Sequence, residues 1–332
     1  MPKYMKIKPI IIVSGEPYSV FLEIFFKTLN NKKIKNLKTP ILIIASYDLV
    51  LKQMRKLKYS FKIKLFDHKF TNLNMLSNKN INLININFNH NKTFDKISTK
   101  SNKYITQCFN LGLKLMKEKK GRALINGPIS KKHFLKKKFP GITEYISSKT
   151  AHSGREVMLI YNKNLAVSPI TTHLPLKSIF NKITKKKIIK QVITINKFYK
   201  KFLKKVPNIA ITGLNPHCES SKDKNEEKKI ISPAIKLLSK KKIKILGPFP
   251  ADTLFIKKNI KKFDVIIGMY HDQVLTPIKT LYEFNAINIT LGLPFIRISP
   301  DHGTNNQMIG QNKSNPTSFK EAINFADKIR VN

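Results

Sequence analysis

Short runs of β-branched and other apolar residues recur along the chain and alternate with longer amphipathic stretches. Such runs are typical of strands that are buried on both faces of a parallel sheet. The expected strands are Ile10–Val13, Ile41–Ile44, Ala123–Ile125, Ala166–Val167, Ile209–Ile211, Ile243–Ile245 and Val265–Ile267. Between them, apolar residues at three- and four-residue spacing predict helices over 105–116 and, after a cap at Thr184, over 188–202. The alternation predicts an α/β protein with a mostly parallel sheet.

The chain is strongly basic, with 63 Lys and Arg against 19 Asp and Glu and a formal net charge of +44. Such a charge suggests a nucleic acid or an anionic membrane as partner. The lysines are spread along the whole chain, however, and no nucleic-acid-binding motif accompanies them. Solvated charge runs are the commoner case, so neither a specific nucleic acid nor a membrane is expected as partner.

Length and cysteine usage indicate the number of domains and the cellular compartment of the protein. A chain of 332 residues is long enough for one large domain or two of ordinary size. Two distant cysteines, Cys108 and Cys218, suggest no disulfide framework and fit a reducing compartment. The apolar stretch Pro9–Val13 is too short for a signal-peptide core or a membrane span, and no later stretch reaches spanning length. A cytoplasmic protein is therefore expected.

Three histidines, His173, His217 and His271, directly follow expected strands. Ligands of open α/β sheets bind at the carboxyl ends of the strands. Three imidazoles there can converge on one divalent ion and leave a coordination position open for substrate, which is the layout of a catalytic metal site. A single histidine is more often a surface or core residue, so spacing alone leaves both interpretations open.

Candidates for binding an anion lie nearby in the sequence. Lys279, Asn288 and Arg297 follow the last of these histidines, and a guanidinium fork or an ammonium group suits a phosphate or carboxylate. Lys279 is equally well explained as one more surface lysine, whereas Arg297 lies inside an apolar segment. The dinucleotide motif GxGxxG is absent after the first strand, where Gly15-Glu16-Pro17 stands. Nicotinamide binding therefore does not follow from that motif.

Several motifs in order resemble those of the 4-hydroxythreonine-4-phosphate dehydrogenase family. The likeness runs from about Gly15 to the end of the chain and is dense after Ala123. The matching strings are Gly141–Tyr145, Thr171–Leu176, Gly213–His217, Gly247–Phe255, Met269–Gln273, Asn288–Arg297 and Asp301–Thr304.

The resemblance implies a fold of two α/β/α domains with a central cleft, like that of the isocitrate and isopropylmalate dehydrogenases. The expected cofactor-side domain comprises residues 1–135 plus 305–332. The expected metal- and substrate-binding domain, residues 136–304, also forms the dimer. The implied assembly is a homodimer whose active site is completed by the partner subunit.

The resemblance also implies roles for individual residues. His173, His217 and His271 match the family's metal ligands, one of them donated by the partner subunit. The matched substrate-binding positions are Thr143, Lys279, Asn288 and Arg297. The cofactor positions are His302, Gly303 and Thr304, with His302 lying against the adenosine half of NAD. The candidate catalytic residues are Lys279, Asp252 and Asp272, of which the two aspartates match acidic positions near the metal; the general base stays open.

The implied reaction is the NAD-dependent oxidation of 4-phosphohydroxy-L-threonine to 2-amino-3-oxo-4-phosphooxybutanoate with a divalent metal. That product decarboxylates to 3-amino-2-oxopropyl phosphate, in the biosynthesis of pyridoxal phosphate (vitamin B6). NADP as the cofactor stays open. So does the metal, because three imidazoles accept zinc, magnesium, cobalt or manganese.

Three departures from the family pattern keep alternatives open. Ile142 stands where the family has His, and isoleucine can form no side-chain hydrogen bond. The segment Tyr18–Phe21 replaces a loop with two glycines, and Asn305–Asn312 lacks an Asp expected near the cofactor. One alternative is a relative that oxidises threonate or erythronate 4-phosphate. The other, from a different class, is a basic RNA-associated protein without activity.

Overall fold

The computed structural model describes residues 7–69, 75–136, 138–219 and 225–330, and they form two compact units. The first unit comprises Met1–Gly154 and Leu293–Ile329, and the second Arg155–Gly292 and Arg330–Asn332. These divisions differ from the expected domain boundaries at 135/136 and 304/305. The division of labour between a cofactor-side and a metal-binding domain stays a prediction.

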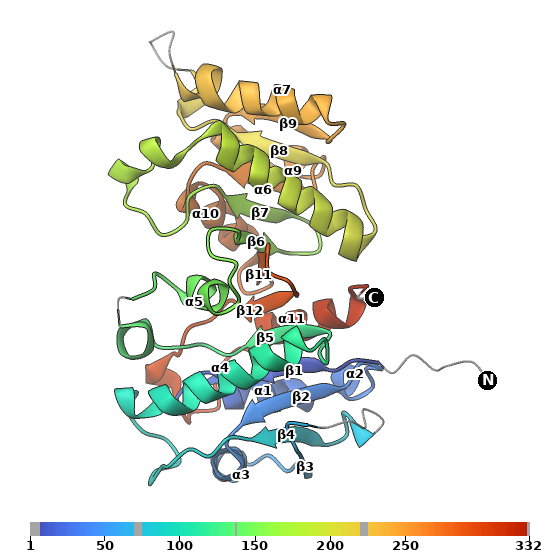
Figure 1. Ribbon diagram of the computed structural model, residues 1–332, viewed down its shortest axis with the longest axis vertical. Coiled ribbons are helices and arrows are strands. Elements are labelled where there is room, and N and C mark those ends of the chain that lie inside the picture. The colour runs from blue at the N-terminus through green and yellow to red at the C-terminus, as the bar shows by residue number, and fades with distance from the viewer. Residues whose placement is uncertain (1–6, 70–74, 137, 220–224, 331–332) are drawn as a thin grey trace, which may run out of the picture. The chain divides into compact units, whose positions relative to one another are not determined.

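Six parallel strands form the sheet of the first unit (Figure 1). Their order is β3 (Ile63–Phe66), β4 (Ile81–Asn85), β2 (Ile41–Ala45), β1 (Ile10–Val13), β5 (Ala123–Asn126) and β12 (Arg297–Pro300). From β1 the chain adds β2 beside it, then the edge strand β3, then β4 between β2 and β3, and then crosses to β5 on the other side of β1. In open α/β sheets the carboxyl ends of the strands at such a switch point are where ligands bind.

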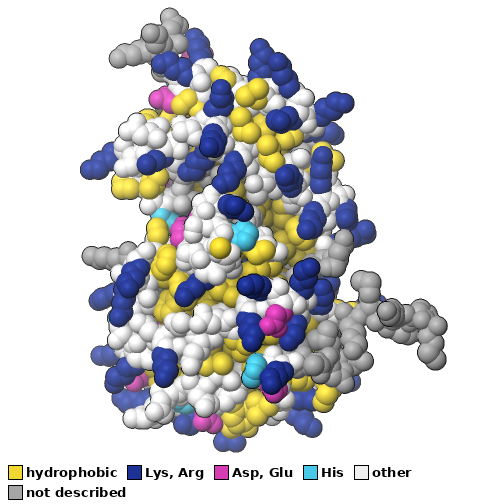
Figure 2. Space-filling view, viewed as in Figure 1, with side chains coloured by type: hydrophobic (Ala, Val, Ile, Leu, Met, Phe, Trp, Pro, Cys, Tyr) yellow, Lys and Arg dark blue, Asp and Glu magenta, His cyan; other side chains and the backbone are white. Residues whose placement is uncertain are grey.

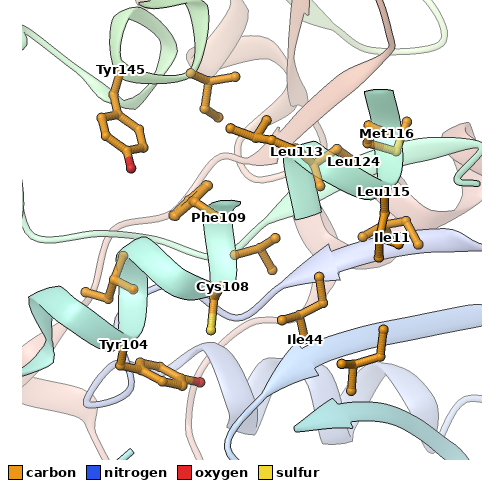
Figure 3. Close-up of a cluster of buried hydrophobic side chains, with 14 of the residues drawn as sticks. Ile11, Ile44, Tyr104, Cys108, Phe109, Leu113, Leu115, Met116, Leu124 and Tyr145 are labelled. Atoms are coloured by element: carbon orange, nitrogen blue, oxygen red, sulfur yellow. The ribbon is translucent and has the colours of Figure 1, made fainter. Parts of the chain in front are cut away.

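Helices cover both faces of this sheet; they are α1 (Phe21–Leu29), α2 (Lys32–Lys35), α3 (Tyr47–Lys56), α4 (Asn102–Lys117), α5 (Ile142–Lys149) and α11 (Thr317–Lys328). Figure 3 shows that Cys108 and Phe109 of α4 point toward the sheet. They belong to the same buried cluster as Ile11 of β1, Ile44 of β2 and Leu124 of β5. Residues that alternate with Ile11 along β1 point to the opposite face. There α1 and α11 pack together through Phe21 and Phe319, and burial of each of these two side chains stabilises the unit by roughly 2 kcal/mol.

The second unit has a mixed sheet (Figure 1). The strand order is β11 (Ile287–Leu291), β6 (Val157–Tyr161), β7 (Ala166–Pro169), β10 (Val265–Gly268), β8 (Ile209–Thr212) and β9 (Ile245–Phe249). The last four are parallel, whereas β6 runs antiparallel to β7 and β11. The helices are α6 (Lys185–Phe198), α7 (Ser232–Lys240), α8 (Ala251–Leu254), α9 (Lys257–Ile260) and α10 (His271–Tyr282).

The expected α/β class is confirmed, and every expected strand overlaps an observed one. The fit is poorest for Ile243–Ile245, because β9 begins only at Ile245. The cap of α6 is confirmed, since Thr184 Oγ1 accepts a hydrogen bond from Lys187 N at 3.2 Å. That helix ends at Phe198, and a π-helical turn follows it. No helix in the described ranges is both long enough and apolar enough to cross a membrane.

Candidate active site

The chain segments that carry His173 and His271 leave the sheet of the second unit side by side. β7 and β10 are parallel neighbours and end at the same level. Beyond the strands, Thr171 Oγ1 donates a hydrogen bond to Met269 O at 2.8 Å, so the two segments stay together. The imidazole rings of His173 and His271 consequently lie next to each other, with their centroids 6.0 Å apart.

Asp272 orients the ring of His271. Its Oδ1 lies 2.6 Å from His271 Nδ1, and the side chains of Asp272 and His271 are 79% and 34% exposed. A carboxylate at one imidazole nitrogen fixes the ring orientation and the tautomer, which leaves Nε2 as the nitrogen that can bind a metal. Asp272, a candidate catalytic residue, thus contacts Nδ1 of His271 in the structure. Its catalytic role stays a prediction.

The spacing of His173 and His271 suits a shared divalent ion. Nitrogen ligands bind such an ion at about 2.1 Å, which puts the centres of two ligand rings about 5–6 Å apart. The third expected ligand, His217, lies exposed in the turn Pro216–Cys218 after β8. Over the described part of one chain, no three His, Cys, Asp or Glu side chains are grouped to hold a metal ion. Two of the three expected ligands are therefore brought together, and the three-ligand site stays a prediction.

Asp252 lies in the first turn of α8, where its exposed Oδ1 accepts a hydrogen bond from Thr253 N at 2.8 Å. Burial raises the pKa of the Cys218 thiol, and the charges of Glu227 and Asp252 raise it further. Asp252 is therefore near the turn that carries His217. This position is compatible with the expected place of an acidic residue near the metal, and the role stays a prediction.

Lys279 and Asn288 also belong to the second unit. Lys279 lies on α10, about 12 Å further along the helix than His271. Burial lowers the pKa of Lys279, so its ammonium group gives up a proton more readily than that of an exposed lysine. On β11, Asn288 Oδ1 is buried and has no hydrogen-bond partner among the described residues. A buried acceptor is rarely left without a donor, so Asn288 is suited to accept a hydrogen bond from a ligand.

Arg297 and Thr143 are brought together in the first unit. The Arg297 side chain is fully buried; its Nε donates to Asn126 Oδ1 at 2.8 Å and its Nη1 to Thr143 Oγ1 at 3.1 Å. Burial lowers the pKa of Arg297 to about 10, and the charge of Glu144 acts against this shift. The guanidinium group therefore stays charged at neutral pH. A buried, oriented guanidinium beside a threonine hydroxyl is suited to bind a phosphate or carboxylate.

Ile142, the residue that replaces the family's histidine, begins α5 directly after the cap residue Gly141. Its half-buried side chain packs against the apolar core on the α4 side of the sheet. The position is thus filled by an apolar contact. Thr143, the next residue, keeps its hydroxyl on Arg297, so the replacement leaves this neighbouring contact in place.

The predicted cofactor residues follow β12 in the first unit. His302 Nδ1 lies 3.1 Å from Gly303 O, and its Nε2 is buried without a partner among the described residues. Burial lowers the pKa of His302, so the ring is neutral at physiological pH. Thr304 O accepts a hydrogen bond from Val20 N at 3.3 Å, which ties this segment to the loop after β1.

A cavity of about 500 Å³ lies beside the segment that follows these residues, and it is lined by Lys92, Phe94, Asp95, Lys96, Ile97, Asn306 and Ile309. Its size is in the usual range for small-molecule sites. Two of its residues, Asn306 and Ile309, come from the stretch in which this chain departs from the family pattern. The cavity is therefore a candidate place for part of a dinucleotide, and the altered segment forms one of its walls.

Asn126, which contacts Arg297, was not predicted as a site residue from the sequence. It is the last residue of β5 and only 1% exposed, yet its side chain holds Arg297 through Oδ1. A signal was present, because a polar residue that ends an apolar strand lies at the edge of the sheet where ligands bind. The partner could not be inferred, since Arg297 is 171 residues away in the sequence.

The high positive charge is not concentrated on the face seen in Figure 2. Lys and Arg side chains are scattered over that whole face, with hydrophobic and uncharged surface between them. Nucleic-acid-binding proteins gather such residues into a patch or stripe. The visible surface therefore has the distribution expected of solvated lysines.

Comparison with known proteins decides the family. The chain matches the family model described as pyridoxal phosphate biosynthetic protein PdxA over residues 36–326. The chain belongs to this family. A curated relative, the 4-hydroxythreonine-4-phosphate dehydrogenase of Sulfurihydrogenibium sp. (strain YO3AOP1), is 38% identical over 319 residues, which cover 95% of this chain and 96% of that protein. The motif resemblance is thereby confirmed, as is the expectation that this PdxA family member is a dehydrogenase.

Solved structures agree with this assignment. The crystal structure of 4-hydroxythreonine-4-phosphate dehydrogenase from Klebsiella pneumoniae has a TM-score of 0.83 and 26% identity, and the match covers 96% of this chain and 98% of that chain. A terephthalate 1,2-cis-dihydrodioldehydrogenase from Burkholderia xenovorans LB400 has a TM-score of 0.66 at 17% identity, over 97% of this chain and 98% of that one. This second likeness shows a shared fold alone.

Proposed function

We propose that this PdxA family member oxidises 4-phosphohydroxy-L-threonine with NAD and a divalent metal. The product, 2-amino-3-oxo-4-phosphooxybutanoate, then loses carbon dioxide to give 3-amino-2-oxopropyl phosphate for pyridoxal phosphate biosynthesis. One observation carries the proposal: His173 and His271 lie together, with ring centroids 6.0 Å apart, at the carboxyl ends of parallel strands. The names of the relatives support the substrate.

The chain's own residues supply binding and orientation. His173, His217 and His271 would hold the metal, with Asp272 fixing the ring of His271. When bound, the ion acts as a Lewis acid on the substrate's hydroxyl group, and NAD accepts the hydride. Zinc, magnesium, cobalt and manganese all suit imidazole ligands with open positions, and NADP is an alternative to NAD.

Substrate contacts follow from charge and hydrogen-bonding capacity. Arg297 and Thr143 are one candidate pair for binding an anionic group of the substrate, and the ammonium group of Lys279 is another candidate for such a group. Asn288 Oδ1, a buried acceptor, is suited to a donor such as the substrate's amino group. Binding energy from such groups positions the carbinol carbon for hydride transfer. Burial lowers the pKa of Lys279, and a lysine whose pKa is lowered is suited to hold or release a proton at Nζ.

We further propose a homodimer in which one of the three histidines comes from the partner subunit. Support comes from His217, which is exposed on its turn, and from the finding that no three metal-binding side chains are grouped in the described part of one chain.

His302, Gly303 and Thr304 are the proposed contacts to NAD. The buried Nε2 of His302 would accept a hydrogen bond from the cofactor.

A second substrate is favoured by one observation. Ile142 replaces a histidine with an apolar contact, so the polar surroundings of the substrate differ from those of the family. Threonate or erythronate 4-phosphate is therefore the alternative substrate. The scattered lysines of Figure 2 give no comparable support to an RNA-associated protein without activity.

The deciding experiment follows NADH absorbance with purified protein and 4-phosphohydroxy-L-threonine, with and without divalent metal, and with erythronate 4-phosphate in parallel. We expect turnover of the amino acid that a chelator stops and that His271→Ala abolishes. Faster turnover of erythronate 4-phosphate would establish the alternative substrate. A folded protein that turns over neither substrate in the presence of metal would refute the dehydrogenase proposal.

A further inference from the structure

The turn that carries His217 has an unfavourable backbone conformation. His217 and Cys218 have φ angles of 55° and 59°, so two consecutive residues with side chains are left-handed. Residues other than glycine rarely adopt this conformation, and it persists only where the surroundings impose it. The turn therefore depends on the position of the chain that leads into it. Two side chains to which no role was assigned from the sequence hold that segment.

The first is Glu227, a carboxylate that is only 3% exposed. Its Oε1 accepts hydrogen bonds from Leu214 N at 2.7 Å and from Asn215 N at 2.9 Å, and its Oε2 accepts one from Asn215 Nδ2 at 2.9 Å. Burial alone would raise the pKa of Glu227, but the hydrogen bonds from this loop outweigh it and hold the pKa below its ordinary value. The buried carboxylate of Glu227 thus accepts three hydrogen bonds from the segment that leads to His217.

The second is Gln273, which lies two positions after His271 in the first turn of α10. Its Nε2 donates to Gly213 O at 2.8 Å, at the start of the segment that leads to His217. Its Oε1 accepts from Thr212 Oγ1 at 2.8 Å and from Met269 N at 2.7 Å. The side-chain amide of Gln273 thus joins the end of β8 to the end of β10. These hydrogen bonds restrict independent movement of the segments that carry His217 and His271.

We propose that Glu227 and Gln273 are positioning residues that hold the His217 turn in its metal-binding conformation and fix it to the helix that begins with His271. This inference rests on the proposed function of the histidines as metal ligands. The hydrogen bonds remove conformational freedom from the ligand before the metal arrives, so less freedom is lost on binding. The same reasoning applies whether His217 serves its own chain or the partner subunit.

The test compares full-length variants in a titration with cobalt, followed by its visible absorption bands, and in amide hydrogen exchange of residues 213–219. We expect Glu227→Gln and Gln273→Ala to weaken cobalt binding about tenfold or more. Glu227→Gln should also accelerate exchange at the amides of Leu214 and Asn215, because a neutral amide oxygen is a weaker acceptor than a carboxylate and the new NH2 group faces the donor Nδ2 of Asn215. The matched control is Glu226→Gln, which removes the same charge from the neighbouring residue but affects no backbone amide of the segment, since Glu226 accepts one bond, from Asn215 Nδ2 at 3.0 Å. Its affinity should stay within about twofold.

The outcomes separate the positioning role of Glu227 and Gln273 from the proposed function of the histidines. Wild-type affinity in both Glu227→Gln and Gln273→Ala would overturn the positioning role while leaving the metal site intact. Weaker binding in Glu227→Gln without faster exchange at Leu214 would overturn it too, because the effect would then not pass through the turn. A wild-type protein that binds no cobalt would instead refute the proposed function. If Glu227→Gln does not fold, Gln273→Ala decides, since it leaves no charge unpaired.

Discussion

Arg297 Nε donates a hydrogen bond to Asn126 Oδ1 at 2.8 Å, and this bond joins the first residue of β12 to the last residue of β5. β5 and β12 are parallel neighbours, so the bond lies at the edge of the sheet where the carboxyl end of β5 meets the start of α5. The guanidinium group is held on one side by Asn126 and on another by Thr143. Its orientation is therefore set before any anion binds.

This arrangement predicts that lysine cannot replace Arg297. Arg297→Lys keeps the charge but loses the planar fork that reaches Asn126 and Thr143 at once. We expect the KM for the phosphorylated substrate to rise at least tenfold, and the free energy of unfolding to fall by roughly 3 kcal/mol. Steady-state kinetics and urea denaturation measure the two effects. Arg55→Lys, an exposed change on α3, is the control and should alter stability by less than about 0.5 kcal/mol. Equal effects of the two changes would contradict the role of Arg297.

A shared active site predicts that two inactive variants complement each other. His173→Ala and His217→Ala should each lack activity as homodimers. In a mixed dimer, one site combines His173 and His271 of one chain with His217 of the other and is complete. Random reassortment after mixing should restore about a quarter of wild-type activity, because half of the dimers are mixed and each has one complete site. If all three ligands of a site come from one chain, mixing will restore nothing.

The buried Glu16 predicts a pH dependence of stability. It is 2% exposed in the loop after β1, and burial raises its pKa from 4.5 to about 7, while the bond from Ser101 acts against this shift. A raised pKa means that folding favours the neutral acid, so this stabilisation is full below about pH 4.5 and is lost as the pH rises to about 7. The loss amounts to about 3 kcal/mol at most.

Glu16→Gln should therefore raise the Tm at pH 8 and change it little at pH 5. Thermal unfolding followed by circular dichroism at both values measures the difference. Glu118→Gln, a change of an exposed residue on the same unit, is the control and should leave the pH profile unchanged. An equal effect of Glu16→Gln at pH 5 and pH 8 would show that Glu16 does not titrate in this range.

Two glycines with the same backbone angle should respond differently to alanine. Gly15 and Gly154 both have φ of 73°, but a Cβ on Gly15 would lie 2.4 Å from Pro128 O, whereas a Cβ on Gly154 would meet nothing within 4 Å. Gly154→Ala should cost roughly 1 kcal/mol for the left-handed conformation. Gly15→Ala should cost roughly 3 kcal/mol or more, because backbone must also move. Denaturant titrations of the two variants compare them directly, and equal losses would rule out the close approach.

Strands buried on both faces were predictable because they form unbroken apolar runs, as Ile10–Val13 and Val265–Gly268 do. β12 was not among the expected strands, since its first residue, Arg297, breaks the apolar pattern. The run Val157–Tyr161 of β6 is as apolar as the others and was overlooked. Its antiparallel pairing with β7 and β11 depends on distant partners, which no local pattern reveals.

The candidate site was predictable only as far as the ends of strands. His173, His217 and His271 stand out because each follows such a run, but which strands are neighbours is a property of the whole sheet. The proximity of His173 and His271 follows from the pairing of β7 with β10, whose sequences lie far apart. Glu227 gave no signal, and Gln273 stood out only as the last residue of the matching string Met269–Gln273. The importance of both lies in hydrogen bonds to distant segments, which no local pattern reveals.

The first unit is built from both ends of the chain, and this has a consequence for synthesis on the ribosome. Arg122 donates hydrogen bonds to Ala326 O at 2.7 Å, to Asp327 O at 2.9 Å and to Ile329 O, all in the segment that is translated last. Until β12 and α11 emerge, the edge of β5 has no neighbouring strand and the apolar face under α11 is uncovered. The second unit, a nearly continuous stretch, is complete earlier. The nascent chain therefore carries an unfinished sheet through most of its translation, and this is the period in which a chaperone would bind it or aggregation would begin.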